Sequence, residues 1–212
     1  MKIIRFLFVV TICLFFISSI DAQEKFKRFQ LEFGYGASLS GDFGKNDYQI
    51  FSDFDFTIPL VGKNIEATLK YKLKNNRFIG IGYTEQSYVN TLNGIGVLGD
   101  RVLVFENYRL EEEVQYYELQ YGKFFNNGLD FTISLFSIHY YQPILDVETI
   151  NGKTGFVFSN VDPLIDDIGL SLALGCRIYE YNTIVISLRT RVFYSLNGLE
   201  AITLSPLVRV DF

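Results

Sequence analysis

The chain has few of the residues that cross-link or rigidify most secreted proteins. Its 212 residues include two cysteines, four prolines, one histidine, one methionine and no tryptophan. Cys13 lies in an apolar segment that we expect to be removed, so Cys176 has no partner for an internal disulfide. One thiol and the single histidine, His139, also fall short of the four ligands of a structural zinc site. The sequence therefore predicts a fold held by strand pairing, with no metal and no other cofactor.

Positive charge and long apolar runs are scarce as well. The chain has 19 basic against 24 acidic residues, a net charge of −5. Nucleic-acid binding depends on basic side chains that neutralise phosphates, so this balance argues against a nucleic-acid partner. The apolar run 6–16 is shorter than the roughly 20 residues that a membrane-spanning helix needs. No Pro- or Ser-rich linker divides the chain, which favours a single domain.

The first 22 residues are organised like a cleavable secretory signal. Lys2 and Arg5 give a basic start, and the apolar run 6–16 follows. Ser18 and Ala22 then supply the small residues that precede a cleavage site. We therefore predict a signal peptide at 1–22 and one exported domain at 23–212.

What the chain does have is a period-two alternation of apolar and polar residues, which is typical of strands. In the clearest case, Ile168, Leu170 and Leu172 alternate with Gly169 and Ser171. Eight segments show the pattern: 29–39, 65–73, 79–84, 116–122, 131–136, 167–178, 184–192 and 202–212. Segments of this length suit tilted membrane strands, because roughly 9 to 11 residues cross the hydrocarbon layer.

Short and long polar connections separate these segments in alternation. The short turns are 74–77, 126–128 and 180–182; the long connections are about 40–64, 88–113 and 142–165, the last with a hairpin tip expected at Asn151-Gly152. The turn at Asn197-Gly198 is the exception, because it is short where a long loop is expected. This order predicts an all-β, transmembrane, antiparallel up-and-down barrel of eight strands. Ten strands stay open, because 48–58 and 101–106 could pair as two more.

Periodicity alone does not say which face of the strands points inward. In a soluble sandwich or lipocalin-like barrel the apolar face would form the core. Glycines on the polar face suit a crowded narrow lumen, and tyrosines near strand ends suit the aromatic girdles of a membrane barrel. These features favour an apolar face toward lipid and a polar face toward the lumen.

The last segment carries a resemblance to a known group. Ile202, Leu204 and Val208 alternate with polar residues up to the terminal Phe212. A strand of this kind resembles the terminal strand of small bacterial (Bacteroidota-type) outer-membrane β-barrels, similar in architecture to the transmembrane domain of outer membrane protein A. The resemblance implies a location in the bacterial outer membrane, contact with its lipid, and recognition by the barrel-assembly machinery. The residues expected to carry that assembly signal are Val208, Val210 and Phe212.

Two features depart from this resemblance. Pro206 stands in the middle of the last strand, where its missing N–H would spoil the ladder unless a bulge accommodates it. The chain also lacks tryptophan, so tyrosine and phenylalanine must form the girdles.

If the polar face lines the lumen, it carries equal numbers of opposite charges. The residues are Glu32, Glu66, Lys70, Lys72, Glu118, Asp130, Asp167, Arg177, Arg189, Arg191, Arg209 and Asp211. Because eight strands enclose only a narrow interior, mutual pairing is favoured over an open channel. Strand order predicts Glu32 between Lys70 and Arg209, and Glu118 at a height similar to that of Arg189.

Two motif-like strings have simpler explanations. Gly94, Gly96 and Gly99 match a dinucleotide-binding fingerprint, but that site needs a helix to follow and this sequence continues as strand. We expect a glycine-rich loop tip there. Ser137 and His139 share the outer face of the fifth segment, as in hydrolases that modify membrane lipids, but no orienting acid is evident beside them. We expect girdle residues.

The acidic clusters and the first long connection remain. Glu111 to Glu113, and Asp162 with Asp166 and Asp167, lack the spacing of an ion-binding loop and are expected to be solvated. In the first connection, Phe54 and Phe56 alternate with acids, which indicates a hairpin beyond the membrane or a surface for a protein partner.

Three classes of function follow. The first is a non-enzymatic barrel with an occluded lumen that stabilises the envelope or presents its long loops to a partner. The second is a narrow solute or ion pore, which requires a continuous water path through the lumen. The third is a lipid-modifying hydrolase at Ser137 and His139.

Overall fold

The computed structural model describes residues 28–41, 54–57, 61–98, 101–141, 143–150, 153–160 and 166–212. The expected signal peptide at 1–22 lies outside the described residues, so its cleavage stays a prediction. The described strands are β1 (Phe29–Ser40), β2 (Phe54–Thr57), β3 (Val61–Lys72), β4 (Arg77–Leu98), β5 (Arg101–Phe124), β6 (Leu129–Tyr141), β7 (Pro143–Ile150), β8 (Lys153–Asn160), β9 (Asp166–Tyr181), β10 (Ile184–Ser195) and β11 (Gly198–Asp211). A 3-10 turn, η2 (Lys74–Asn76), joins β3 to β4.

Eight of these strands close into an antiparallel barrel, which confirms the predicted fold. The ring runs β1, β3, β4, β5, β6, β9, β10 and β11, and β11 pairs back onto β1. The ten-stranded alternative is wrong. Residues 101–106 form the beginning of β5 and are not a separate strand. β2 pairs with residues 91–94 of β4, outside the ring. Each of the eight strands is already paired on both sides, so the ring has no free edge at which two more strands could join.

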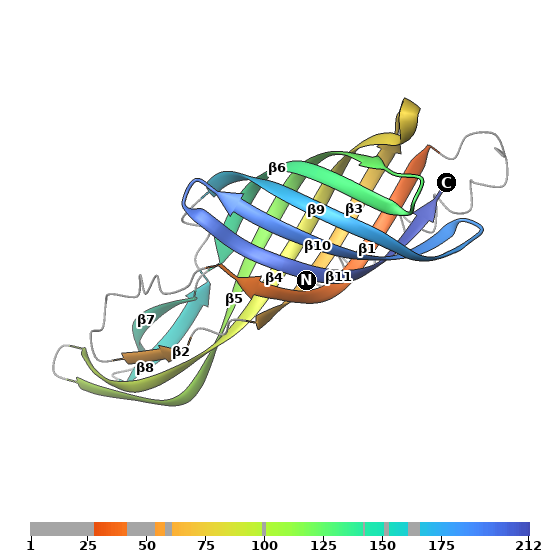
Figure 1. Cartoon of the computed structure of the whole chain (residues 1–212). Coiled ribbons are helices and arrows are strands. Elements are labelled where there is room, and N and C mark those ends of the chain that lie inside the picture. Colours follow the sequence, from red (N-terminus) through yellow and green to blue (C-terminus); the bar gives the residue numbers. More distant parts are fainter. Residues whose placement is uncertain are drawn as a thin grey trace.

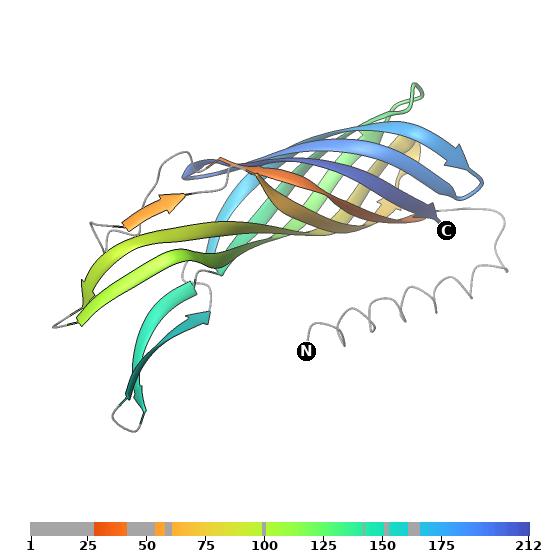
Figure 2. The same cartoon turned by 90° about the horizontal axis from the view of Figure 1, so that it is seen from below.

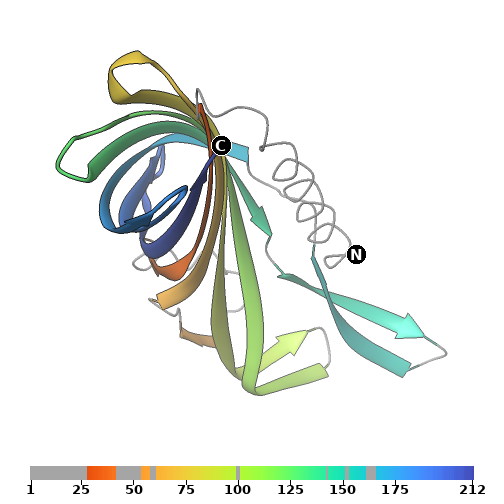
Figure 3. The same cartoon turned by 90° about the vertical axis from the view of Figure 1, so that its right-hand side faces the viewer.

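The short turns and both ends of the barrel chain lie at one end of the molecule. Phe212 N–H donates to the carbonyl of Phe29, so β11 and β1 meet at that end. The turn before β4 uses Asn75 and Asn76 in the left-handed conformation, and Asn182 does the same between β9 and β10. Figures 1 and 3 show this end, where C is marked.

The connection 88–113, expected as a long loop, is mostly strand. β4 and β5 stay paired from Arg77 opposite Lys123 to Leu98 opposite Arg101, with one irregularity between Leu92 and Gly94. The pair runs well past the other barrel strands (Figures 1 and 2). The expected glycine loop is therefore wrong for 94–98, because Gly94 and Gly96 lie within β4; Gly99 is outside the described residues.

A second hairpin follows β6. β7 and β8 pair with each other, from Pro143 opposite Asn160 to Ile150 opposite Lys153. The third long connection therefore contains regular structure, although its expected tip at Asn151-Gly152 lies outside the described residues.

The barrel has its apolar face outside and its polar face inside. Along β10, Ile184, Ile186 and Leu188 are exposed, whereas Ser187 and Arg189 are buried. The same alternation holds on the neighbouring strands, with outward Phe33, Leu69, Ile81, Leu119, Leu135, Leu172, Leu174 and Leu204. An apolar band around a polar interior is the arrangement of an outer-membrane-type barrel, so the soluble alternatives with an apolar core do not apply. Among the described residues, no helix is long and apolar enough to cross a membrane.

Pro206 is accommodated without a bulge at its own position, because the register shift between β10 and β11 lies between Phe193 and Tyr194. It pairs opposite Leu188 of β10 and points outward. On the β1 side, residue pairing stops after Gly34 opposite Leu207 and resumes in the same register at Ala37 opposite Leu204. The missing N–H therefore coincides with a local gap in one ladder, and the register on either side is unchanged.

Candidate functional site

The centre of the lumen is an ion network organised around Glu32. One oxygen of this carboxylate, Oε2, lies 2.7 Å from Lys70 Nζ and 2.7 Å from Arg189 Nη2. All three side chains are at most 2% exposed. Arg209 Nη1 lies 3.9 Å from the other oxygen. Glu32 thus sits between Lys70 and Arg209, the arrangement that strand order predicts.

A second part of the network lies farther from the short-turn end. Arg191 Nη1 donates to Glu118, and Arg191 Nη2 lies 3.2 Å from Glu66 Oε2. Glu118 also accepts hydrogen bonds from Thr84, at 3.0 Å, and Ser171, at 3.2 Å. Its cation is therefore Arg191, two residues along β10 from Arg189, the residue that we expected at a similar height.

Arg189 joins the two parts of the network. Its Nη1 lies 3.7 Å from Glu66 Oε2, and its Nη2 lies 3.7 Å from Asp130 Oδ1. Desolvated charges are tolerated when opposite charges and hydrogen bonds compensate them. The buried cations are Lys70, Arg189, Arg191 and Arg209; the buried anions are Glu32, Glu66, Glu118 and Asp130. Equal numbers of each sign make the filled lumen close to neutral.

Aromatic rings support the cations nearest the short-turn end. Lys70 Nζ lies 4.4 Å from the centre of the Phe78 ring, and the Arg209 guanidinium lies 4.8 Å from the centre of the Phe124 ring. The two rings pack on each other at 4.7 Å. Inward aromatic faces attract cations that have lost water, so these contacts add to the ion pairs.

An aromatic layer fills the lumen on the loop side of the ion network. The Tyr116 ring lies 4.3 Å from Phe193 and 5.3 Å from Phe136, centre to centre. These side chains pack with Ile138 and Ala201, and all are at most 3% exposed. This layer was not anticipated. The sequence did contain an indication of it, because Tyr116 and Phe136 alternate in phase with the polar residues of their strands. The prediction of the lumen considered charged residues alone and so did not include these two.

Polar contacts cover the aromatic layer toward the loops. Tyr140 donates its hydroxyl hydrogen to Glu200, which also accepts a hydrogen bond from Ser195. On the other wall, Tyr88 donates to Gln86 at 2.7 Å. From the short-turn end toward the loops, the lumen is thus filled first by the ion network, then by the aromatic layer and then by these polar contacts.

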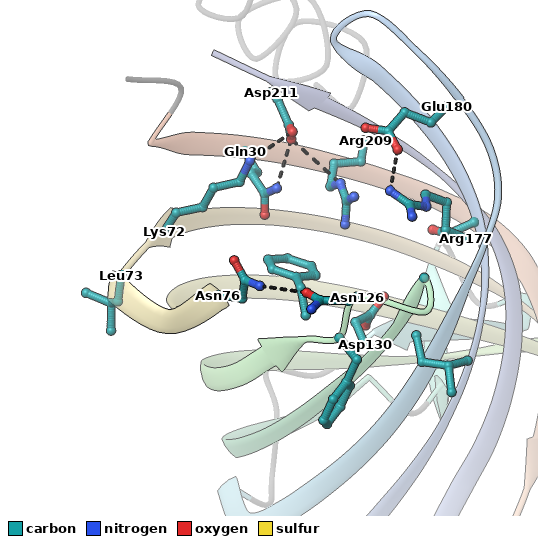
Figure 4. A pocket seen from close by; sticks show the side chains of 15 residues that line it. Gln30, Lys72, Leu73, Asn76, Asn126, Asp130, Arg177, Glu180, Arg209 and Asp211 are labelled. Carbon is teal, nitrogen blue, oxygen red and sulfur yellow. Dashed lines mark hydrogen bonds and ion pairs between the residues drawn. The ribbon is translucent and has the colours of Figure 1, made fainter. Parts of the chain in front are cut away.

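The short-turn end of the lumen opens into a cavity of about 380 Å³. Lys72 Nζ donates to Asp211 Oδ2 at 2.9 Å, and Gln30 Nε2 donates to Asp211 Oδ1 at 2.8 Å (Figure 4). Arg177 pairs with Glu180 at the cavity rim, where Arg177 is 39% exposed. Arg177 therefore lines the mouth of the lumen, as its strand face predicts, and pairs there with Glu180 instead of joining the buried ions around Glu32.

The register of β9 and β10 keeps Arg177 on the lumen face. Arg177 pairs opposite Ser187, which is buried and also lines the cavity. The bulge of β9 comes after Arg177, between it and Tyr179. Arg177 is exposed because it lies close to the short-turn end, where the cavity opens.

The remaining predicted residues lie outside the network. Asp167 accepts a hydrogen bond from Asn197 at 2.9 Å near the loop end. Val208 faces outward and is 46% exposed, and the Phe212 ring stacks on Phe29 at 6.1 Å. Whether Val208, Val210 and Phe212 act as an assembly signal stays a prediction.

Ser137 and His139 lie on the outer wall near the loop end of β6. Ser137 Oγ lies 3.4 Å from His139 Nε2, and the Tyr117 ring meets the imidazole edge-on at 5.2 Å. A hydrolase requires a base that is itself oriented toward the nucleophile.

In the described part of the chain, no cluster of three or more His, Cys, Asp or Glu side chains could hold a metal ion.

The known proteins that resemble this chain are solved structures with low sequence identity to it. No protein-family model and no curated protein match the sequence. Among solved structures, the chain is similar to the outer membrane protein Ail of Yersinia pestis, solved in complex with the heparin analogue sucrose octasulfate (TM-score 0.48, 11% identity, covering 87% of this chain and 98% of that one). It is also similar to the N-terminal β-barrel domain of OprF from Pseudomonas aeruginosa (0.42, 9%, 87% and 98%) and to the outer membrane protein OprG of the same organism (0.43, 11%, 86% and 92%).

Proposed function

We propose that this protein is a non-enzymatic, non-conducting barrel that anchors an extended sheet and long loops at the outer surface of the outer membrane, where they contact a protein partner. The observation that carries the proposal is the closure of the lumen by two unlike layers. One layer is the ion network around Glu32 and Arg191; the other is the aromatic layer around Tyr116.

Opening a water path through this lumen would be costly. Separating one partner of a buried, hydrogen-bonded ion pair typically costs about 3–5 kcal/mol. Here several pairs share Glu32 and Arg189, so moving one side chain disturbs more than one contact. The aromatic layer would have to move as well. Both barriers favour the occluded barrel over the narrow pore.

The strand lengths support a role outside the bilayer. β4 has 22 residues, which at about 3.3 Å per residue is roughly 70 Å of strand. Only roughly 9 to 11 residues are needed to cross the hydrocarbon layer. About half of β4, and the matching half of β5, therefore projects beyond the membrane on the loop side, together with β2. A paired projection of this size can present a surface to a partner.

The test combines heat-modifiable gel mobility with planar-bilayer conductance on the same purified sample. We expect a folded, faster-migrating band and no steady current. A variant that truncates the aromatic layer, Tyr116→Ala, Phe136→Ala and Phe193→Ala, should stay closed, because the ion network around Glu32 still fills the lumen. Steady, ion-selective current from the unmodified protein would instead support the pore.

A further inference from the structure

The cavity at the short-turn end has the size and position of a ligand site. Its volume of about 380 Å³ falls within the roughly 300–1,000 Å³ of small-molecule pockets. The ion network closes its inner end, so a ligand would enter from the side of the short turns. Polar residues of β1, β3, β6, β9 and β11 line it, and Phe124, Phe125 and Leu129 supply apolar wall.

Arg209 offers a binding group for a carboxylate. Its nearest anions are Asp211 Oδ1, 3.6 Å from Nε, and Glu32 Oε1, 3.9 Å from Nη1. Both separations are longer than a hydrogen bond. Phe124 supports the guanidinium from one side, and Figure 4 shows the side chain directed toward the cavity. A guanidinium with donors free for a ligand suits a bidentate carboxylate.

Asp130 and Gln30 offer acceptors for a cation. Asp130 Oδ1 accepts no hydrogen bond within the described part of the chain; Arg189 Nη2 lies 3.7 Å away. Gln30 Oε1 also lacks a donor there, because only its Nε2 is used, by Asp211. Both side chains are at least nine-tenths buried and line the cavity. Gly175 leaves the space that the Asp130 carboxylate fills, since a Cβ there would lie 2.3 Å from Oδ2.

The other charges of the cavity are already matched. Lys72 is bound to Asp211, and Arg177 is bound to Glu180. A ligand with a single charged group would supply a partner for Arg209 or for Asp130, but not for both. A ligand with one group of each sign would leave both pairs intact and supply what Arg209, Asp130 and Gln30 lack.

We propose that the cavity binds a small zwitterion of the size of an amino acid or a dipeptide. Its carboxylate binds Arg209, its ammonium group binds Asp130 and Gln30, and its apolar part contacts Phe124. The site faces the side of the membrane opposite the projecting sheet, so it is independent of the proposed contact with a partner outside.

The experiment uses two dipeptides and the whole barrel. The probes are L-alanyl-L-alanine and the same dipeptide blocked by N-acetylation and C-terminal amidation. Each is titrated into the ¹⁵N-labelled protein in detergent micelles, and the amide NMR shifts are followed. The free dipeptide should give saturable shifts that are confined to the neighbourhood of Asp130, Arg209 and Asp211. The blocked dipeptide should give none.

Variants locate the two binding groups. Arg209→Gln and Asp130→Asn should each weaken binding about ten-fold or more, because each removes a charge-assisted hydrogen bond. Lys74→Gln, which removes a positive charge from the adjacent turn outside the cavity, should bind like the unmodified protein. Gel mobility checks that each variant is folded. If a variant does not fold, the proposal is judged by the binding of the two dipeptides to the unmodified protein. The proposal is overturned if no saturable shift occurs, if the blocked dipeptide binds equally, or if the folded variants bind like Lys74→Gln.

Discussion

Glu32 Oε2 lies 2.7 Å from Lys70 Nζ on β3 and 2.7 Å from Arg189 Nη2 on β10. One carboxylate oxygen therefore joins two strands that do not neighbour each other in the barrel. The contact runs across the lumen, where a soluble protein would have an apolar core. Stability of the barrel should depend on this residue more than on any rim charge.

Glu32→Gln should destabilise the folded barrel by about 3–5 kcal/mol, because it leaves Lys70 and Arg189 buried without their shared anion. Urea unfolding in lipid vesicles, read by gel mobility, measures the loss. Glu180→Gln is the matched control: it removes an acid from an exposed pair with Arg177, for which about 0–1 kcal/mol is expected. Equal effects of the two substitutions would contradict a central role for Glu32.

Gly169→Val should disturb the aromatic layer. A Cβ at this position would lie 2.4 Å from Phe136 Cζ and 2.4 Å from the carbonyl oxygen of Tyr194. The second contact is with backbone and cannot be relieved by a rotamer change, so we expect a clear loss of folded protein and no rescue by Phe136→Ala. Folding yield in detergent measures it. Leu170→Val, on the outward face of the same strand, should fold normally; a folded Gly169→Val barrel would refute the packing described.

Leu119→Arg tests the orientation of the outer face. Leu119 is 66% exposed and points outward in the middle of the barrel part of β5, at a level where an arginine costs about 2–4 kcal/mol of insertion free energy. Leu196→Arg is the control, because Leu196 is 83% exposed but lies in the turn before β11, where about 0–1 kcal/mol is expected. Denaturant titration in bilayers compares the two. A neutral Leu119→Arg would argue against lipid contact at this face.

Ser137→Ala should leave membrane lipids unchanged. The Ser137–His139 separation of 3.4 Å is a weak contact between neighbours on one strand face, and a girdle position explains both residues. Mass spectrometry of lipids from cells with and without the protein, and with the variant, measures acyl composition. An acyl chain that is removed only when Ser137 is present would establish the hydrolase instead.

The alternation of Ile184, Ile186 and Leu188 with Ser187 and Arg189 was enough to predict a strand and its two faces, because side chains on a strand point alternately to opposite sides. The same reasoning predicted eight strands, the antiparallel order and the short turns. It did not predict that β4 and β5 stay paired through 88–113, because glycines and acids there resemble a loop until two strands are seen side by side.

The sequence by itself determined the strands and which side chains share a face, since that information is local and repeats every two residues. Only the tertiary structure decided which charges meet. Arg191 binds Glu118, and Arg189 reaches Glu66 and Asp130, because strand tilt and stagger decide which side chains meet inside a closed barrel. Tyr116, Phe136 and Phe193 likewise come from three different strands and form one layer only when the barrel closes.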